Sequence, residues 1–105
     1  MKLVFAIVNS DDSQAVGKAL LNAGFYATKL ASTGGFLSAG NTTFLTCVEE
    51  DRLEELISVI REKSHKRKKT VPNSTPINSG IELPVEVEVG GATVFVTDVE
   101  RFEKL

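Results

Sequence analysis

The sequence is poor in the residues that carry most metal and redox chemistry. Its 105 residues include one cysteine, one histidine and no tryptophan. The single Cys47 excludes an intramolecular disulfide, and together with His65 it supplies too few soft ligands for a zinc site within one chain. We interpret Cys47, which lies in an apolar strand-like run, as a buried thiol that packs as a small hydrophobe. We therefore expect no metal and no cofactor.

Long apolar runs and a strong excess of one charge are also missing. No segment approaches the length of a transmembrane helix, and the run from Leu3 to Val8 is too short for the core of a signal peptide. The formal net charge of −2 argues against general binding to nucleic acids or to anionic membranes. We expect a cytoplasmic protein with no direct contact to nucleic acid and no membrane insertion.

The sequence contains no recognisable catalytic constellation. His65 lies in a basic run without an obvious carboxylate or nucleophile nearby in the sequence. The glycine-rich loop matches neither the P-loop pattern nor the dinucleotide-binding pattern, and it joins a strand to a strand. We therefore predict that the protein is not an enzyme and has no catalytic residues.

What the sequence does contain is the composition and patterning of one globular domain, residues 1–105, with 42% hydrophobic and 25% charged residues. A capping-box pattern predicts a helix that begins at Asp11 with Gln14 and ends before Gly24, and a second helix begins at Asp51. Apolar and alternating runs predict the strands Leu3 to Val8, Phe25 to Thr33, Thr42 to Val48, Val85 to Val89 and Ala92 to Val96.

This order predicts an α+β, ferredoxin-like βαββαβ sandwich with an extra C-terminal hairpin strand. Gly90 and Gly91 are expected to form the two-residue turn of that hairpin, and Asp98 to Leu105 a short helical tail. The strand from Leu3 to Val8 is apolar on both faces, but the two helices cover only one face of the sheet. We therefore expect oligomerisation to cover the other face.

Two loops stand out. The connection between the second and third strands holds Gly34, Gly35 and Gly40, and also the apolar Phe36 and Leu37. Glycines permit close backbone approach and the surrounding hydroxyls and amide offer uncharged hydrogen bonds, which suits a nucleobase. Packing of Phe36 and Leu37 on a neighbouring subunit explains the pattern equally well. We expect Thr70 to Pro84, which holds all three prolines, to be a long loop without regular structure.

Basic residues concentrate just before that second loop. Five of the twelve basic residues lie between Lys63 and Lys69. Because acidic residues open the second helix and basic residues close it, the run complements the helix macrodipole. Direct contact with a phosphate is the alternative function of this run.

Two long motifs resemble the PII-like cyclic-di-AMP receptors. They are the run from Ala27 to Phe44 and the run from Pro84 to Val96, and the resemblance extends over nearly the whole chain. It implies a ferredoxin-like homotrimer without enzymatic activity, which binds one nucleotide at each of three subunit interfaces. It also implies signal transduction through loop rearrangement, which acts on a downstream protein that the sequence does not name.

The resemblance implies that ligand contacts come mainly from the glycine loop and its two flanking strands. Phe95 is expected to contribute from the adjoining subunit. Carried over by position, the ligand-binding residues are Ala27, Thr28, Gly35, Phe36, Leu37, Asn41 and Phe95.

The chain departs from the family pattern at four positions. Tyr26 stands where the family has arginine, Gly24 where it has asparagine, Cys47 where it has glycine, and Lys104 where it has an amide. Loss of the arginine removes a charge-assisted hydrogen bond of about 1.5–3 kcal/mol, which weakens cyclic-di-AMP binding or shifts the ligand preference. Lys104 or the basic run is a possible replacement for that charge. Two alternatives stay open: a trimer that binds another nucleotide, small molecule or ion, and an interaction trimer without a ligand.

Overall fold

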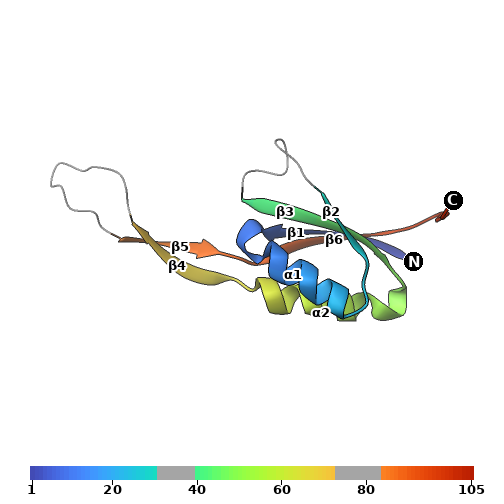
Figure 1. Ribbon diagram of the computed structural model, residues 1–105, viewed down its shortest axis with the longest axis horizontal. Helices are drawn as coiled ribbons and strands as arrows, with labels where there is room; N and C mark the ends of the chain where they lie inside the picture. The colour runs from blue at the N-terminus through green and yellow to red at the C-terminus, as the bar shows by residue number, and fades with distance from the viewer. Residues whose placement is uncertain (31–39, 73–83) are drawn as a thin grey trace.

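The computed structural model describes residues 1–30, 40–72 and 84–105, which form two helices and six strands (Figure 1). In chain order the elements are β1 (Lys2–Asn9), α1 (Ser10–Asn22), β2 (Ala27–Leu30), β3 (Asn41–Val48), α2 (Leu53–Ser64), β4 (Arg67–Pro72), β5 (Pro84–Val89) and β6 (Ala92–Asp98). A single 3-10 turn, Glu50–Arg52, leads into α2.

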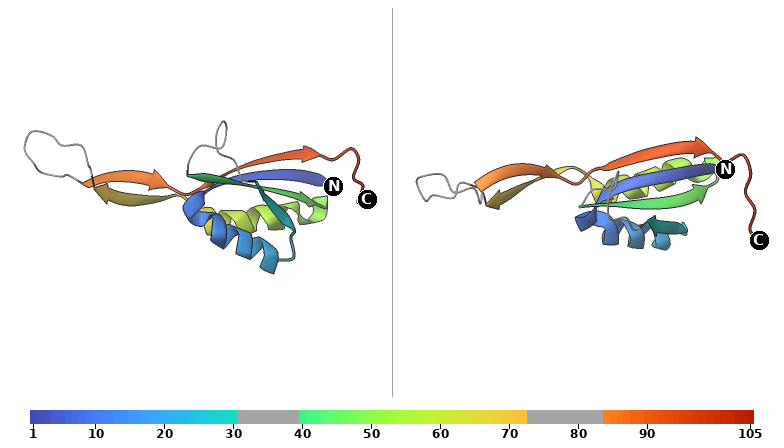
Figure 2. Two further views of the ribbon diagram at one scale, coloured as in Figure 1. Left: turned by 45° about the horizontal axis from the view of Figure 1, so that its top comes forward. Right: turned by 90° about the horizontal axis from the view of Figure 1, so that it is seen from above.

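Four strands form one antiparallel sheet in the order β2-β3-β1-β6. Helices α1 and α2 lie side by side on one face of this sheet (Figure 2). This α+β arrangement is compatible with the predicted ferredoxin-like fold, in which a helix follows the first strand and another follows the third. The opposite face, called the open face, is not covered by either helix (Figure 2).

The predicted C-terminal hairpin is wrong. Strand β5 pairs with β4, from Arg67↔Val89 to Pro72↔Pro84, whereas β6 pairs with β1 in the main sheet. The β4–β5 ribbon projects from the body along the long axis of the molecule, and the chain runs on from β5 into β6 (Figures 1 and 2). The radius of gyration is accordingly 17.4 Å, well above the value of about 13 Å for a compact domain of this length.

Gly90 and Gly91, which were predicted to form the hairpin turn, have a different structural role. Gly90 and Gly91 have φ angles of 86° and 81°, but they lie where the chain leaves the ribbon and joins the sheet. A Cβ atom at Gly90 would lie 2.6 Å from the carbonyl oxygen of His65. Glycine is therefore required for close backbone approach as well as for the positive φ.

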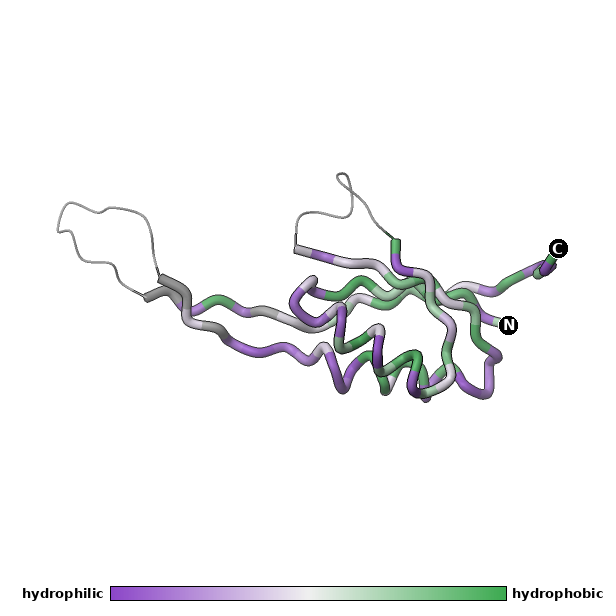
Figure 3. Tube along the Cα trace, viewed as in Figure 1, coloured by the Kyte–Doolittle hydropathy of each residue, from purple (hydrophilic) through white to green (hydrophobic). Residues whose placement is uncertain are grey.

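The ribbon also corrects two other predictions. The expected loop from Thr70 to Pro84 is wrong at both of its ends, because β4 extends to Pro72 and β5 begins at Pro84. The basic run is divided, since Lys63 lies in the last turn of α2 whereas the run from Arg67 onward belongs to β4. Figure 3 shows the resulting hydrophilic course of β4, in contrast to the apolar β1.

The hydrophobic core lies between the helices and the covered face. Alternate residues of β1, Val4, Ala6 and Val8, are at most 1% exposed. They pack with apolar side chains of both helices and of β3 and with Phe25, so that the buried cluster comprises Val4, Ala6, Val8, Val16, Leu20, Phe25, Phe44, Val48, Leu56 and Ile60. Burial of these side chains removes apolar surface from water and supplies the main driving force for folding.

Helix α1 begins two residues earlier than an N-cap at Asp11 predicts, and it ends where predicted. Asn9 is its N-cap, and the Asn9 side chain accepts a hydrogen bond of 2.8 Å from the backbone N–H of Asp11. The capping box at Asp11 is therefore wrong. At the other end, Gly24 has a φ of 85° and the N–H groups of Gly24 and Phe25 donate to the carbonyls of Leu21 and Leu20. This is a Schellman motif, with Gly24 at the predicted C′ position.

The predicted helical tail is also wrong. Residues up to Asp98 extend β6, and the described residues 99–105 contain no helix. Asp98 lies opposite Lys2 in the sheet, and the two side chains form an ion pair. The start of the segment is therefore part of strand β6. The residues that follow are too few to form a stable helix alone.

Candidate functional site

The open face of the sheet carries three of the seven predicted ligand residues. Thr28 lies opposite Leu45, Leu45 lies opposite Phe5, and Phe5 lies opposite Phe95. These residues form one row across all four strands, on the face away from the helices, since side chains alternate along each strand. Asn41, the first residue of β3 and four residues before Leu45, has the same parity as Leu45 and belongs to this face.

The centre of this face is apolar, and the two helices lie on the other side of the sheet (Figure 2). Phe95 is 51% exposed, and Leu3, Phe5, Ile7 and Leu45 are only partly buried. The same strand, β1, buries Val4, Ala6 and Val8 almost completely on the other side. An exposed apolar surface of this kind is typical of a protein or ligand interface.

A small pocket lies at the Asn41 end of the open face. Its volume is about 250 Å³, and its lining combines the ends of β1, β3 and β6 with the base of the ribbon: Ile7, Asn9, Asn41, Lys66, Gly90, Gly91, Ala92 and Thr93. Two amide side chains, one ammonium group and a glycine backbone therefore meet in one place. Such a set offers hydrogen bonds and one positive charge, which suit a polar, anionic ligand.

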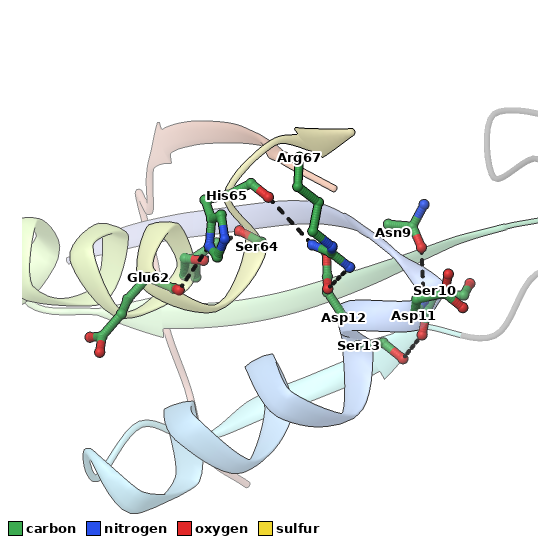
Figure 4. A network of polar contacts seen from close by, with 10 residues as sticks. Asn9, Ser10, Asp11, Asp12, Ser13, Glu62, Ser64, His65 and Arg67 are labelled. Carbon is green, nitrogen blue, oxygen red and sulfur yellow. Dashed lines mark hydrogen bonds and ion pairs between the residues drawn. The ribbon is translucent and has the colours of Figure 1, made fainter. Parts of the chain in front are cut away.

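An ion pair holds the base of the ribbon to the body beside this pocket (Figure 4). Arg67 Nη2 donates to Asp12 Oδ1 at 2.8 Å, and Arg67 Nη1 donates to Asp12 Oδ2 at 3.3 Å. The Asp12 side chain is only 8% exposed. The hydrogen bond to Asp12 raises the pKa of Arg67 above its ordinary value, so the guanidinium stays charged.

The first turn of α1 also contacts the start of β3. The backbone N–H of Ser10 donates to the carbonyl of Gly40 at 2.7 Å, and the hydroxyls of Ser10 and Thr42 lie 3.4 Å apart. Asp12, two residues after Ser10, forms an ion pair with Arg67 of the ribbon. One short segment therefore connects the base of the ribbon to the strand end that carries Asn41.

A larger cavity of about 440 Å³ lies between α2 and β6 and shares Lys66, Gly91 and Ala92 with the Asn41 pocket. Apolar side chains of Ile57, Ile60 and Val94 form part of its wall, and Arg61 and His65 contribute polar groups. None of the predicted ligand residues lines it. The cavity belongs to the helix-covered side of the sheet, because Val94 lies opposite the buried Ala6.

The described residues contain no cluster of metal-ligating side chains. In the ranges 1–30, 40–72 and 84–105 no group of three His, Cys, Asp or Glu side chains could hold a metal ion. His65 is exposed, and its ring Nδ1 lies 3.4 Å from the backbone carbonyl of Glu62. No helix in the described part of the chain is long and apolar enough to cross a membrane.

Comparison with known families agrees with this picture of a binding protein. A family model described as cyclic-di-AMP receptor matches residues 1–105. The chain belongs to the cyclic-di-AMP receptor family. The predicted family is thus confirmed. Membership of this receptor family supports a role of the chain in nucleotide-binding signalling.

A solved structure supports the fold. The chain is 39% identical to a functionally unknown protein from Pediococcus pentosaceus ATCC 25745, with a TM-score of 0.77. The match covers 99% of this chain and 96% of the other. Both proteins therefore share the same fold over essentially their whole length.

The structure brings only part of the predicted family site together. Thr28, Asn41 and Phe95 lie on the open face, whereas Ala27 has the opposite parity and lies opposite Thr46. Gly35, Phe36 and Leu37 lie outside the described residues. Thr28 and Phe95 are separated by three strand spacings, which is about 14 Å within one subunit.

Two of the departures from the family pattern lie next to each other. Thr46 donates a hydrogen bond of 2.6 Å to the carbonyl of Tyr26, and one further step in the β2–β3 register brings Tyr26 beside Cys47. Tyr26 is 87% exposed and Cys47 is exposed as well. The prediction of a buried thiol is therefore wrong, because Cys47 alternates onto the open face rather than into the core.

Sequence reasoning missed the residues that organise the pocket. No sequence pattern marks Asn9 or Asp12 as a site residue, and Lys66 and Arg67 belong to the basic run from Lys63 to Lys69, for which contact with a phosphate is the alternative function. Asp12 and Arg67 are 55 residues apart in the sequence. A single sequence contains no signal that pairs one acidic residue of a helix start with one arginine of a distant basic run.

Proposed function

We propose that the protein receives a signal by binding cyclic-di-AMP on the open face of the sheet, between the subunits of a homotrimer. The observation that carries the proposal is the row of residues from Thr28 to Phe95 on the open face of the sheet. The polar pocket lies at the Asn41 end of that face. Family membership supports the choice of cyclic-di-AMP as the ligand.

The uncovered face supports an oligomer, and the family resemblance makes that oligomer a trimer. Phe5 and Phe95 are neighbours on adjacent strands, and both would lose contact with water if the sheets of several copies faced each other. We expect sedimentation of the wild-type protein at micromolar concentration to give a trimer. A well-folded monomer under those conditions would contradict this part of the proposal.

The distance across the sheet supports a shared site. Because Thr28 and Phe95 of one subunit lie about 14 Å apart, one compact nucleobase cannot contact both. A site in which one subunit provides Thr28 and Asn41 and the next provides Phe95 removes this difficulty. It also accounts for a large aromatic side chain that is half exposed in the isolated chain.

Each proposed residue has a chemical role suited to a purine dinucleotide. Thr28 and Asn41 supply uncharged hydrogen bonds, and Phe36 and Phe95 supply aromatic surface for the bases. The backbone at Gly35 permits close approach to a base edge, and Ala27 and Leu37 add apolar contact. None of these groups is an acid–base catalyst, in agreement with a receptor rather than an enzyme.

Ligand binding is then transmitted to a partner protein. The β4–β5 ribbon projects from the described body of the protein (Figure 1), and the first turn of α1 is bonded to both Gly40 and Arg67. A ligand that alters the position of Asn41 therefore changes the surroundings of the ribbon base as well. The ribbon is the surface that we propose the downstream protein senses.

Calorimetric titration tests the proposal. We expect wild-type protein to bind cyclic-di-AMP more tightly than cyclic-di-GMP, ATP, ADP or AMP. Stacking on an aromatic side chain contributes about 1–3 kcal/mol per base, so Phe36→Ala is expected to weaken binding about five- to more than a hundredfold and to leave the trimer intact. Equal affinity of Phe36→Ala and wild type would place the ligand elsewhere.

A second candidate is a receptor of the same architecture with a different ligand, and the exposed Tyr26 favours it. Tyr26 lacks the charge of the family arginine, which would stabilise a phosphate. If the missing charge limits affinity, Tyr26→Arg strengthens cyclic-di-AMP binding. If another nucleotide is the true ligand, the same titrations rank it above cyclic-di-AMP for the wild type. Binding of none of them would favour an interaction trimer.

A further inference from the structure

The pocket beside Asn41 contains a cation to which no ligand contact has been assigned. Lys66 lines this pocket together with Asn9 and Asn41. A Cβ atom at Gly91 would lie 2.9 Å from Lys66 Cγ and 3.5 Å from Lys66 Cε. The lysine stem therefore lies across Gly91, where any side chain would displace it, and the glycine places the lysine at the pocket.

The next residue in the chain is anchored to the body. Arg67 forms its two hydrogen bonds with the nearly buried Asp12, and its Nη1 also lies 3.4 Å from the carbonyl of His65. Both chain neighbours of Lys66 are thus tied to the base of the ribbon. A two-stranded ribbon has little stability of its own, so these contacts fix where Lys66 lies relative to the sheet.

The charge of Lys66 is available to a ligand. Its ammonium lies 3.8 Å from Glu88 Oε1, and both side chains are largely exposed, at 76% and 61%. Exposed ion pairs of this length are weak and exchange partners readily. The other residues that line the pocket carry no charge, so an anion at Asn41 meets Lys66 without a lining carboxylate to oppose it.

Resting on the proposed function, we propose that Lys66 contacts a phosphate of the cyclic dinucleotide at the Asn41 pocket, and that the Arg67–Asp12 ion pair is the positioning contact that keeps Lys66 there. A lysine ammonium binds phosphate as a point charge without the fixed geometry of a guanidinium. Lys66 then supplies a positive charge to a ligand site in which Tyr26 supplies none.

Titration of four proteins with cyclic-di-AMP, at low and at high salt, tests Lys66. The proteins are wild type, Lys66→Ala, Lys66→Arg and the control Lys68→Ala, whose exposed side chain lies two residues further along and does not line the pocket. We expect Lys66→Ala to bind about five- to tenfold more weakly at low salt and to lose most of the salt dependence. Lys66→Arg and Lys68→Ala are expected to behave like the wild type.

The positioning contact is tested by non-additivity. Asp12→Asn removes the charge that holds Arg67, and we expect it to weaken cyclic-di-AMP binding about two- to fivefold in the wild-type background. In the Lys66→Ala background the same change is expected to have no further effect, because there is no longer a cation to position. Independent effects that multiply would show a general structural role of Asp12 and would overturn the positioning claim.

The outcomes separate this inference from the function on which it rests. If wild type binds and Phe36→Ala binds weakly, but Lys66→Ala equals wild type, the role of Lys66 is overturned and the proposed function stands. If Lys68→Ala loses as much affinity as Lys66→Ala, only overall charge matters and the role of Lys66 is again overturned. If the wild type does not bind cyclic-di-AMP, both claims are overturned.

Discussion

The two faces of strand β1 differ sharply although their sequences are alike. Val4, Ala6 and Val8 point toward the helices and are at most 1% exposed. Leu3, Phe5 and Ile7 are as apolar and alternate with them, yet they are only partly buried on the open face. Apolar character alone therefore does not reveal whether a side chain stabilises the monomer.

The difference teaches how this small protein divides its hydrophobic residues. One face builds a core with two helices, and that core folds the chain. The other face presents Phe5 and Phe95 beside the polar groups Thr28 and Asn41, which is the combination we assign to assembly and ligand binding. Four comparisons between variants test this account.

The largest expected effect is that of a charge on the covered face. Val4→Asp buries a carboxylate at a position that is 0% exposed, and the cost of about 4 kcal/mol or more takes most of the stability of a domain this size. We expect the variant to be unfolded by circular dichroism.

The matched change on the open face is Phe5→Asp. Because Phe5 lies on the uncovered side, we expect this variant to retain the helical signal and to lose the trimer in sedimentation. Unfolding of both variants to the same extent would show that the open face also stabilises the monomer, and the division between the faces would fail.

The next effect concerns truncation within the helices. Leu56 of α2 is 0% exposed, so Leu56→Ala is expected to lower the free energy of unfolding by about 2–5 kcal/mol through lost burial and the cavity left behind. Leu21 of α1 is 65% exposed, and Leu21→Ala is expected to change it by at most about 0.5 kcal/mol. Urea denaturation measures the free energy of unfolding of both variants. Similar losses in the two would contradict the assignment of Leu56 to the core and of Leu21 to the surface.

A smaller effect is expected at the base of the ribbon. Both Gly90 and Gly40 have positive φ, so alanine at either site costs about 1 kcal/mol or more in backbone strain. At Gly90 the new Cβ would also meet the His65 carbonyl at 2.6 Å, whereas at Gly40 nothing lies within 4 Å. We expect Gly90→Ala to be the more destabilising variant in thermal unfolding. The reverse order would mean that the close approach at Gly90 relaxes easily.

The smallest effect is the pH dependence of the ion pair at the edge of the sheet. A hydrogen bond from Lys2 lowers the pKa of Asp98, so folding holds this carboxylate ionised below its ordinary range. The pair stabilises the fold above the unfolded pKa, and this contribution is lost as the pH falls through the lowered folded pKa. NMR titration is expected to show the low pKa in wild type and a return toward the ordinary value in Lys2→Ala. An unchanged pKa in that variant would point to another cause.

Much of the fold was predictable because its signals are local. The continuous apolar run in β1, the apolar stripe that includes Leu56 and Ile60, and the C′ glycine at Gly24 each depend on residues within a few positions of one another. The helix start at Asn9 was missed because several acidic and amide residues adjoin there, and Asp12 forms an ion pair with the distant Arg67.

The C-terminal region was mispredicted because its sequence pattern is compatible with two different structures. A glycine pair between two strand-like runs is typical of a tight hairpin, and it is also what close packing against His65 and Lys66 requires. Only the pairing of β5 with β4 across a long sequence separation distinguishes them. The pocket at Asn41 combines β1, β3, β6 and the ribbon base, so its composition depends on this same long-range pairing.

The central claim is that the ligand site is shared between subunits, and complementation in mixed trimers tests it most directly. Thr28→Ala and Phe95→Ala are each expected to weaken cyclic-di-AMP binding in pure trimers. When the two variants are co-expressed, a shared site places an intact Thr28 of one subunit opposite an intact Phe95 of its neighbour. We predict that calorimetric titration of the mixed trimers then recovers some sites of wild-type affinity. Mixed trimers that bind no better than either pure variant would contradict the account.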